Sequence, residues 1–131
     1  MRAIDTNVVV RLLVRDDAGQ LAVARGLTFH PFLLLPTVIL ETIWVLQSRY
    51  RLERSEIAAR LERLLGHAEA RIASIDAVAW AFEAYKQGHD FADALHIALA
   101  AEAGGESFAS FDKNVQRIEK APLRLEGLTA E

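Results

Sequence analysis

Four acidic side chains stand in stretches of the sequence that are otherwise apolar. They are Asp5, Glu41, Asp93 and Asp112. Charged side chains are rarely buried unless they are paired or bound to something, so acids in such surroundings suggest a binding or catalytic role. Like charges that converge oppose folding unless a cation neutralises them. If the fold gathers these acids, they predict a bound metal ion with oxygen ligands.

Oxygen ligands of this kind predict Mg²⁺ as the cofactor, with Mn²⁺ as the alternative. The chain contains no cysteine, which excludes thiolate nucleophiles, zinc–thiolate sites and disulfides. Mg²⁺ and Mn²⁺ keep several waters and bind through one or two carboxylates, so the other acids can hold waters or a second ion. Such an ion can lower the pKa of an attacking water and neutralise the leaving oxygen of a phosphodiester. The acids therefore predict metal-dependent phosphodiester hydrolysis.

Three of the acids also have a structural interpretation. Asp5 and Asp112 each follow a predicted strand, where an Asp often caps the next helix or supports a loop. Asp93 stands in the first turn of a predicted helix, where the positive end of the helix dipole favours an acid. Asp90 already occupies the cap position of that helix, which leaves Asp93 on the face expected to pack on the sheet. Both interpretations stay open for these three acids. Asp90 itself is expected to be mainly structural, with a supporting role behind the site also open.

Glu41 has the weakest structural alternative. It interrupts residues 33–46, in which nearly every other side chain is apolar, and its burial is therefore expected. A capping box that begins at Thr37 would need a Glu three residues later, but that position holds Leu40. The remaining structural interpretation is a Glu paired with an arginine in the core.

The elements that must position these acids alternate along the chain. Short apolar runs predict strands over residues 2–5, 32–35, 71–74, 107–111 and 123–126. Segments of helical period predict helices over residues 7–13, 21–27, 38–50, 56–65, 77–86 and 91–103, the last four capped by Thr37, Ser55, Asp76 and Asp90. This alternation predicts a three-layer α/β/α domain with a central parallel sheet of about five strands. Ligands bind at the carboxyl ends of such strands, where Asp5 and Asp112 are expected.

The composition is that of one globular domain over residues 1–131, with 52% hydrophobic and 25% charged residues. The N-terminus lacks a signal-peptide pattern and no apolar stretch is as long as a membrane span, so a cytoplasmic protein without membrane contact is expected. The net charge of −3 argues against coating nucleic acid by bulk electrostatics. A local basic rim stays open, formed by cations near the ends of predicted elements: Arg11, Arg15, Arg49, Arg51, Arg54, Lys113 and Arg117.

Four segments carry a resemblance that extends over nearly the whole chain. They are Ile-Asp-Thr-Asn at 4–7 followed by Arg-Leu-Leu-Val-Arg-Asp-Asp at 11–17, Leu-Glu-Thr-Ile-Trp-Val-Leu at 40–46, Asp-Phe-Ala-Asp-Ala-Leu-His at 90–96, and Ser-Phe-Asp-Lys at 110–113. In this order and spacing they resemble the PIN-domain ribonucleases and, among them, the VapC-type toxins of bacterial toxin–antitoxin pairs.

The resemblance implies a PIN fold and Mg²⁺- or Mn²⁺-dependent cleavage of RNA. The four acids fall on the acidic motif positions of the family. Thr6 and Ser110 match hydroxyl positions that accompany those acids, and Asn7 matches a polar position near the site. The resemblance also implies a homodimer. It further implies an antitoxin whose C-terminal segment lies in the active-site groove and brings a basic side chain to the acids.

These inferences give a mechanistic hypothesis for the four acids. Asp5 and Asp93 bind the principal Mg²⁺ directly or through water, Asp112 completes the acidic pocket, and Glu41 orients the attacking water. Water rather than the ribose 2′-hydroxyl attacks phosphorus, so the expected products carry a 5′-phosphate and a 3′-hydroxyl. Histidines are not needed as bases, and His96 is expected to be structural.

Two other functions stay open from the residues alone. A phosphatase or other phosphoryl-transfer domain would also have an Asp at a strand end. It would need a nucleophile and an acid in the pattern Asp-x-Asp, but the residue two positions after Asp5 is Asn7. A non-catalytic RNA- or protein-binding module is the alternative from another class. Substitution of Asp5 or Asp93 by Asn separates that alternative from a nuclease.

Overall fold

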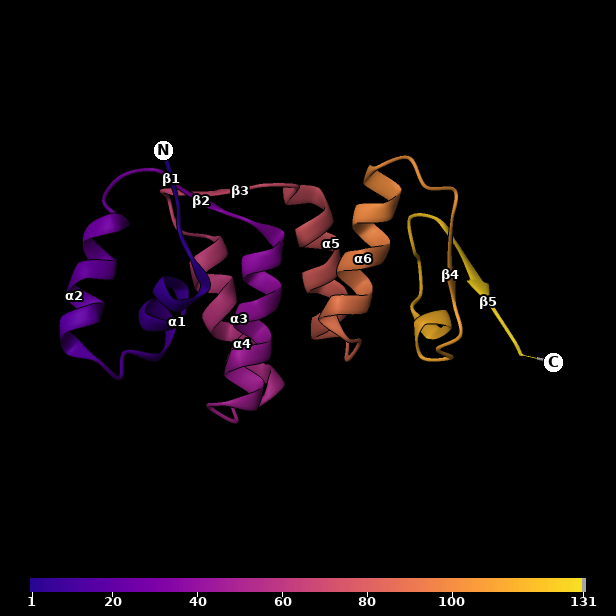
Figure 1. Cartoon of the computed structure of the whole chain (residues 1–131), viewed down its shortest axis with the longest axis horizontal. Coiled ribbons are helices and arrows are strands. Elements are labelled where there is room, and N and C mark those ends of the chain that lie inside the picture. Colours follow the sequence, from indigo (N-terminus) through magenta and orange to yellow (C-terminus); the bar gives the residue numbers. More distant parts are fainter. Residues whose placement is uncertain (131) are drawn as a thin grey trace. The chain divides into compact units, whose positions relative to one another are not determined.

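The computed structural model of the protein describes residues 1–130, which fall into two compact units. The first unit is Met1–Ala73, and the second begins at Ser74. Figure 1 shows the elements of both units in chain order, coloured from indigo to yellow. Over this described part of the chain, no helix combines the length and the apolar content that crossing a membrane requires.

The first unit contains a parallel three-stranded sheet in the order β1-β2-β3 and four helices. Its elements are β1 (Arg2–Ala3), α1 (Thr6–Val14), α2 (Ala18–Leu27), β2 (Phe32–Leu34), α3 (Pro36–Ser48), α4 (Arg54–Leu65) and β3 (Ala70–Ile72). In the central strand, Phe32 pairs with Arg2 on one side and with Ala70 on the other. Two helices connect each pair of neighbouring strands. The carboxyl end of β1 leads into α1, and that of β2 leads into α3 (Figure 1).

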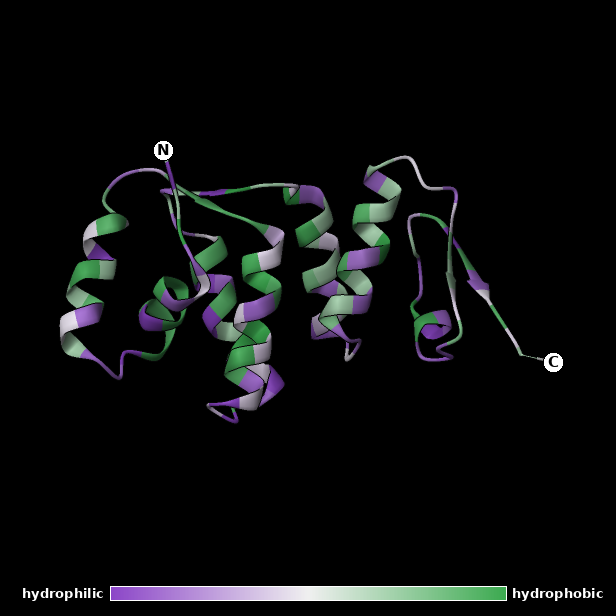
Figure 2. Ribbon diagram, viewed as in Figure 1, coloured by the Kyte–Doolittle hydropathy of each residue, from purple (hydrophilic) through white to green (hydrophobic). Residues whose placement is uncertain are grey.

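Apolar side chains hold these helices together. Helix α1 packs against both α2 and α3, and α4 contributes Ile57 and Leu61, which are fully buried. In Figure 2 hydrophobic residues run along α3, whereas the turn that follows it is hydrophilic. This distribution is expected for helices that bury one stripe of side chains against neighbours and leave their connections in water.

Helix α3 begins earlier than the sequence predicted. Its N-cap is Leu35 and its first residue is Pro36, so Thr37 lies inside the helix and the predicted cap is wrong. Proline is favoured at the first helical position because its φ is already helical and its missing N–H has no partner there in any case. The absence of a capping box at Glu41 still holds, because the position three residues after Leu35 is Val38.

Two other predicted caps are also wrong, and one is confirmed. Helix α4 follows Glu53 rather than Ser55 as its N-cap, and the helix predicted to follow Asp76 begins at Ile75 after Ser74. Ser and Asp are frequent both at caps and in first turns, so the residue type does not fix the boundary to within one or two residues. Asp90 caps its helix as predicted.

The second unit contains two helices, a 3₁₀ turn and two parallel strands. They are α5 (Ile75–Lys86), α6 (Phe91–Glu102), β4 (Ser107–Ser110), η1 (Val115–Arg117) and β5 (Arg124–Gly127). Helices α5 and α6 pack side by side (Figure 1). Ile97 of α6 forms a core with Val115 and Ile118, and Phe108 of β4 packs against it. This core places the end of β4 close to α6.

The strands form two sheets rather than one. The sequence predicted a central sheet of about five parallel strands, whereas within residues 1–130 three strands pair in the first unit and two pair in the second. Strand β4 pairs with β5 over its whole length, from Ser107 opposite Arg124 to Ser110 opposite Gly127. Apolar alternation identifies strands but not their hydrogen-bonded neighbours, and β1, only two residues long, offers few backbone groups for a second partner.

Candidate acidic site

Asp5 stands where β1 ends and α1 begins. Backbone pairing with β2 continues to Ile4, whose N–H donates to the Leu33 carbonyl at 3.2 Å. Asp5 is the N-cap of α1, and its Oδ1 accepts a hydrogen bond from the Thr6 N–H at 2.8 Å. The carboxyl group is exposed. The cap engages one carboxylate oxygen, so the structural role of Asp5 leaves room for a ligand at the other.

A buried hydroxyl connects this strand end to α3. Thr6 is only 7% exposed, and its Oγ1 donates a hydrogen bond to Oε1 of Glu41. The two residues lie 35 positions apart in the chain, so the fold rather than local geometry brings them together. Glu41 is thereby fixed beside the residue that Asp5 caps. Thr6 therefore links Asp5 and Glu41 within the first unit.

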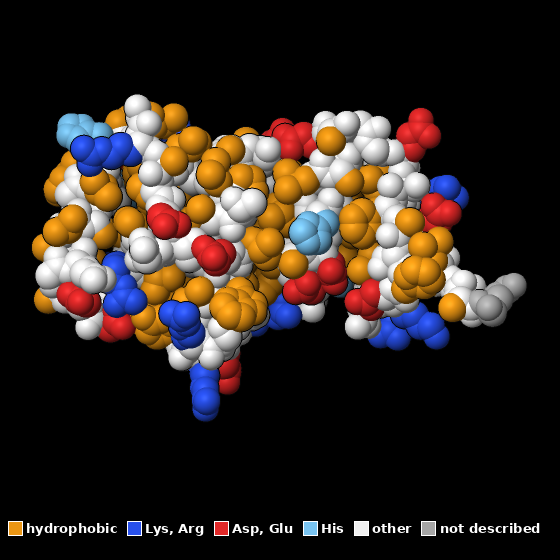
Figure 3. All heavy atoms as spheres, viewed as in Figure 1, with side chains coloured by type: hydrophobic (Ala, Val, Ile, Leu, Met, Phe, Trp, Pro, Cys, Tyr) orange, Lys and Arg blue, Asp and Glu red, His pale blue; other side chains and the backbone are white. Residues whose placement is uncertain are grey.

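The predicted burial of Glu41 is wrong. Helix α3 buries Ile39, Ile43 and Leu46, which are spaced as one helical stripe. Glu41 lies outside this stripe and is exposed, as is Trp44, three residues later, with 60% of its surface accessible. Figure 3 shows acidic side chains among hydrophobic ones on the face drawn. An exposed acid needs no core arginine, which removes the structural alternative given for Glu41.

In the second unit Asp93 lies among other acids. Asp90 caps α6, and its Oδ2 accepts a hydrogen bond from the Asp93 N–H at 3.2 Å. Partial burial raises the pKa of Asp93, the negative charges of Asp90 and Asp112 raise it further, and His96 partly offsets the increase. The ionised Asp93 carboxylate is therefore destabilised by its surroundings, and a bound cation would relieve this.

Asp112 is held by the loop that follows β4. Its N–H donates to Oγ of Ser110 at 3.0 Å, and its Oδ1 accepts from the Asn114 N–H at 2.8 Å. The second bond is an Asx turn, the loop role considered in the structural interpretation of this residue. Ser110 thus supports Asp112 directly, and the exposed carboxylate stays close enough to Asp93 to affect its pKa.

The structure also places three further polar residues that the sequence singled out. Asp90, expected to be mainly structural with a supporting role open, caps α6 and also acts electrostatically on Asp93, three residues later on the same helix turn. Asn7 is exposed on α1 and lines a cavity with Val8 and Arg11. His96 is exposed on α6 although the helix is largely apolar, and its negligible catalytic role stays a prediction.

Each unit therefore assembles two of the four predicted acids, Asp5 with Glu41 and Asp93 with Asp112. Within residues 1–130, no group of three or more acidic or histidine side chains has the geometry of a metal site. The donors themselves fit a hard divalent cation, because all are carboxylate or hydroxyl oxygens and one carboxylate is destabilised when ionised. That the four acids form one site stays a prediction.

A comparison with known protein families matches residues 3–121 to a model described as PIN domain. No curated protein matches the chain. PIN domains have a three-layer α/β/α fold, so the match confirms the predicted fold class. They are generally nucleases and commonly use divalent metals.

Proposed function

The chain belongs to the PIN-domain family, and from this premise we propose that it is a Mg²⁺-dependent endoribonuclease. The observation that carries the proposal is the arrangement of Asp5, Thr6 and Glu41. An exposed carboxylate at a strand end caps the helix that begins at Thr6, and the buried hydroxyl of Thr6 holds a second carboxylate in place. The carboxyl edge of a parallel sheet is where α/β proteins bind ligands.

The proposed ligands of the ion are Asp5 and Asp93, directly or through water, with Asp112 completing the acidic pocket. When bound there, Mg²⁺, or Mn²⁺ in its place, would lower the pKa of the attacking water and neutralise charge on the leaving oxygen. The acidity around Asp93 supports this assignment, because its neighbours raise its pKa and a cation would favour the ionised form.

The remaining side chains have positioning roles in this proposal. The Thr6 hydroxyl donates to Oε1 of Glu41, which leaves Oε2 of Glu41 to orient the attacking water. Ser110 holds the backbone of Asp112, and Asp90 holds the first turn that carries Asp93. Because water attacks, the cleaved strands carry a 5′-phosphate and a 3′-hydroxyl.

Asp5→Asn is the sharpest test of the activity. Asn caps helices about as well as Asp, so the variant keeps the acceptor for the Thr6 N–H and loses only the charge. Purified wild type should cleave single-stranded RNA when Mg²⁺ is added and stop when EDTA is added, whereas Asp5→Asn should not cleave. Asp76→Asn, an exposed acid in the first turn of α5, is the matched control and should cleave normally.

Two outcomes would contradict the proposal. Equal cleavage by wild type and Asp5→Asn would identify a contaminating nuclease, and binding without cleavage by either would favour a non-catalytic RNA-binding module. End-group analysis tests the mechanism separately, because 2′,3′-cyclic phosphate ends would mean attack by the ribose hydroxyl rather than by water.

The cellular role that we propose is that of the toxin in a type II toxin–antitoxin pair, acting on RNA in the cytoplasm. Induced wild type should arrest growth of a bacterial host, and Asp5→Asn at the same expression level should not. A homodimer and a cognate antitoxin are the proposed protein partners. Light scattering of the purified chain tests the first, and relief of the growth arrest by a small adjoining reading frame tests the second.

A further inference from the structure

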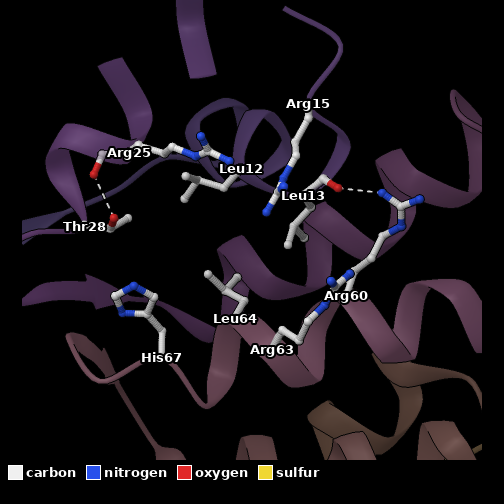
Figure 4. Close-up of a pocket in the computed structure, with 9 residues that line it drawn as sticks. All are labelled: Leu12, Leu13, Arg15, Arg25, Thr28, Arg60, Arg63, Leu64 and His67. Atoms are coloured by element: carbon white, nitrogen blue, oxygen red, sulfur yellow. Dashed lines mark hydrogen bonds between the residues drawn. The ribbon is translucent and has the colours of Figure 1, made fainter. Parts of the chain in front are cut away.

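A second cavity in the first unit lies at the opposite end of α1 from Asp5. Its volume is about 240 Å³, and four arginines line it together with leucines of α1 and α4. The arginines are Arg15, Arg25, Arg60 and Arg63. Figure 4 shows them arriving from three sides, with Leu12 and Leu64 between them. None of the residues that line this cavity is acidic.

The arginines of this cavity lack counter-charges within the chain. Over the described residues, no ion pair involves Arg15, Arg25, Arg60 or Arg63. Arg11, one turn earlier on α1, shows the contrast, because it pairs with Asp16 and donates to the Tyr50 hydroxyl at 2.6 Å. A protein of net charge −3 therefore places four unpaired cations around one cavity.

Helix ends explain only part of this arrangement. Arg15 follows the last residue of α1, Arg25 is in the last turn of α2, and Arg63 is in the last turn of α4. Each helix C-terminus carries roughly half a negative charge, so three of them offset roughly 1.5 of the four positive charges. Roughly 2.5 positive charges remain, which is more than enough to balance the single negative charge of one backbone phosphate.

The backbone holds two of the arginines in place. Nη1 of Arg60 donates to the Leu13 carbonyl at 2.5 Å, which ties α4 to the end of α1. Arg15 adopts the left-handed conformation at φ 62°, a position that favours glycine. This backbone conformation is unfavourable for an arginine, and in it the guanidinium of Arg15 lines the cavity. Guanidinium groups match phosphate oxygens in a planar, two-pronged geometry.

We propose that this cavity binds a backbone phosphate of the RNA strand at a position away from the bond that is cleaved. The inference rests on the proposed ribonuclease function. Helix α1 has nine residues, so the cavity lies roughly 13 Å from Asp5 at 1.5 Å per residue. A stacked strand covers that distance in about four nucleotides. An RNA strand that is bound at both ends of α1 would therefore lie along the length of this helix.

The test is the charge-removing pair Arg25→Gln with Arg63→Gln. Arg25 and Arg63 are both exposed to solvent, so we expect these substitutions to leave the fold unchanged. The matched control is Arg2→Gln with Lys120→Gln, two exposed cations outside the cavity, which removes the same net charge. Fluorescence anisotropy with labelled single-stranded RNA is measured in the Asp5→Asn background, so binding is read without cleavage.

The cavity pair should bind this RNA about tenfold more weakly than the control pair at low salt. The slope of log affinity against log salt should fall by about 0.7, the value for one phosphate contact on a single strand. Inorganic phosphate should raise the melting temperature of the wild type and of the control pair, but not that of the cavity pair. Equal RNA affinity of the two pairs would overturn the proposal.

The outcomes separate this proposal from the proposed function. If the wild type cleaves RNA and the two pairs bind it equally, the cavity proposal fails and the ribonuclease stands. If the Asp5 site proves inactive while the cavity pair alone loses RNA binding and phosphate stabilisation, the cavity proposal stands and the ribonuclease fails. Loss of binding to polyglutamate but not to RNA would assign the cavity to an acidic protein segment and overturn the proposal.

Discussion

The two pairs of acids are held in different ways. In the first unit a buried hydroxyl donor stands beside Glu41, and Asp5 accepts from a backbone N–H. In the second unit Asp93 is surrounded by other carboxylates that raise its pKa. Each carboxylate of the first pair accepts a hydrogen bond from the protein, whereas the ionised form of Asp93 in the second pair is destabilised by its neighbours. The difference suggests that a metal ion would stabilise the second unit more than the first.

The largest expected effect is on cleavage by Asp93→Asn. If Asp93 holds the same ion as Asp5, each single Asn variant should lower kcat/KM on the order of 10³-fold, the loss of several kcal/mol of charge stabilisation. The double variant should then be no slower than either single one, because residues that act as a unit are not additive. Single-turnover cleavage of the same RNA measures all three, and losses that multiply would show two independent sites.

The next effect tests the donor that distinguishes the first pair. Thr6→Val keeps the shape of the buried side chain but removes the hydroxyl that bonds Glu41, so we expect roughly a 10–100-fold loss of kcat, the range seen when a supporting partner of a metal site is removed. Thr6→Ser restores the hydroxyl and should recover most of the activity. A stable Thr6→Val with full activity would mean that Glu41 needs no fixed orientation.

A smaller effect concerns the stability of the second pair without metal. The pKa of Asp93 is raised in the folded protein, so its protonated form favours folding at low pH. This contribution is fully present below the ordinary carboxyl pKa and is lost as the pH rises through the raised value. Metal-free Asp93→Asn should therefore melt at a higher temperature than wild type at neutral pH, and at a similar temperature in acid.

Added Mg²⁺ sharpens that result, because it should raise the melting temperature of wild type and leave Asp93→Asn nearly unchanged. Differential scanning calorimetry over a pH series with EDTA or Mg²⁺ gives both measurements. A variant that is less stable than wild type at every pH would show that Asp93 is needed for packing rather than for a cation.

The smallest expected effect is that of Ser110→Ala. It removes the oxygen that accepts from the Asp112 N–H at 3.0 Å, one hydrogen bond of about 1 kcal/mol. Cleavage should fall only a few-fold, and Ser110→Thr should match wild type. A loss as large as that of Asp93→Asn would instead indicate that Ser110 contacts the ion or the RNA itself.

Sequence patterns predicted the local parts of this protein well. The period of the apolar residues located every strand and helix to within a few positions, and Asp90 was identified as a cap because its side chain acts on its own helix. The strand-end places of Asp5 and Asp112 followed in the same way. These features depend on neighbours in the chain, which the sequence displays directly.

The features that the sequence did not predict depend on contacts between distant segments. Helix α3 is apolar on nearly all sides, so its pattern could not show that the stripe of Ile39 and Ile43 is the buried one and that Glu41 faces outward. The division into two sheets depends on strand pairing. The arginine cavity gathers side chains from residues 15, 25, 60 and 63, which no local pattern connects.

Helix α1 has a geometric consequence for both of its ends. Its nine residues run from the Asp5 cap to Arg15, and a helix changes its length only in whole residues. One inserted residue would move Arg15 about 1.5 Å along the axis and rotate it by about 100° relative to Asp5. The length of α1 therefore fixes both the distance and the angle about the helix axis between Asp5 and Arg15.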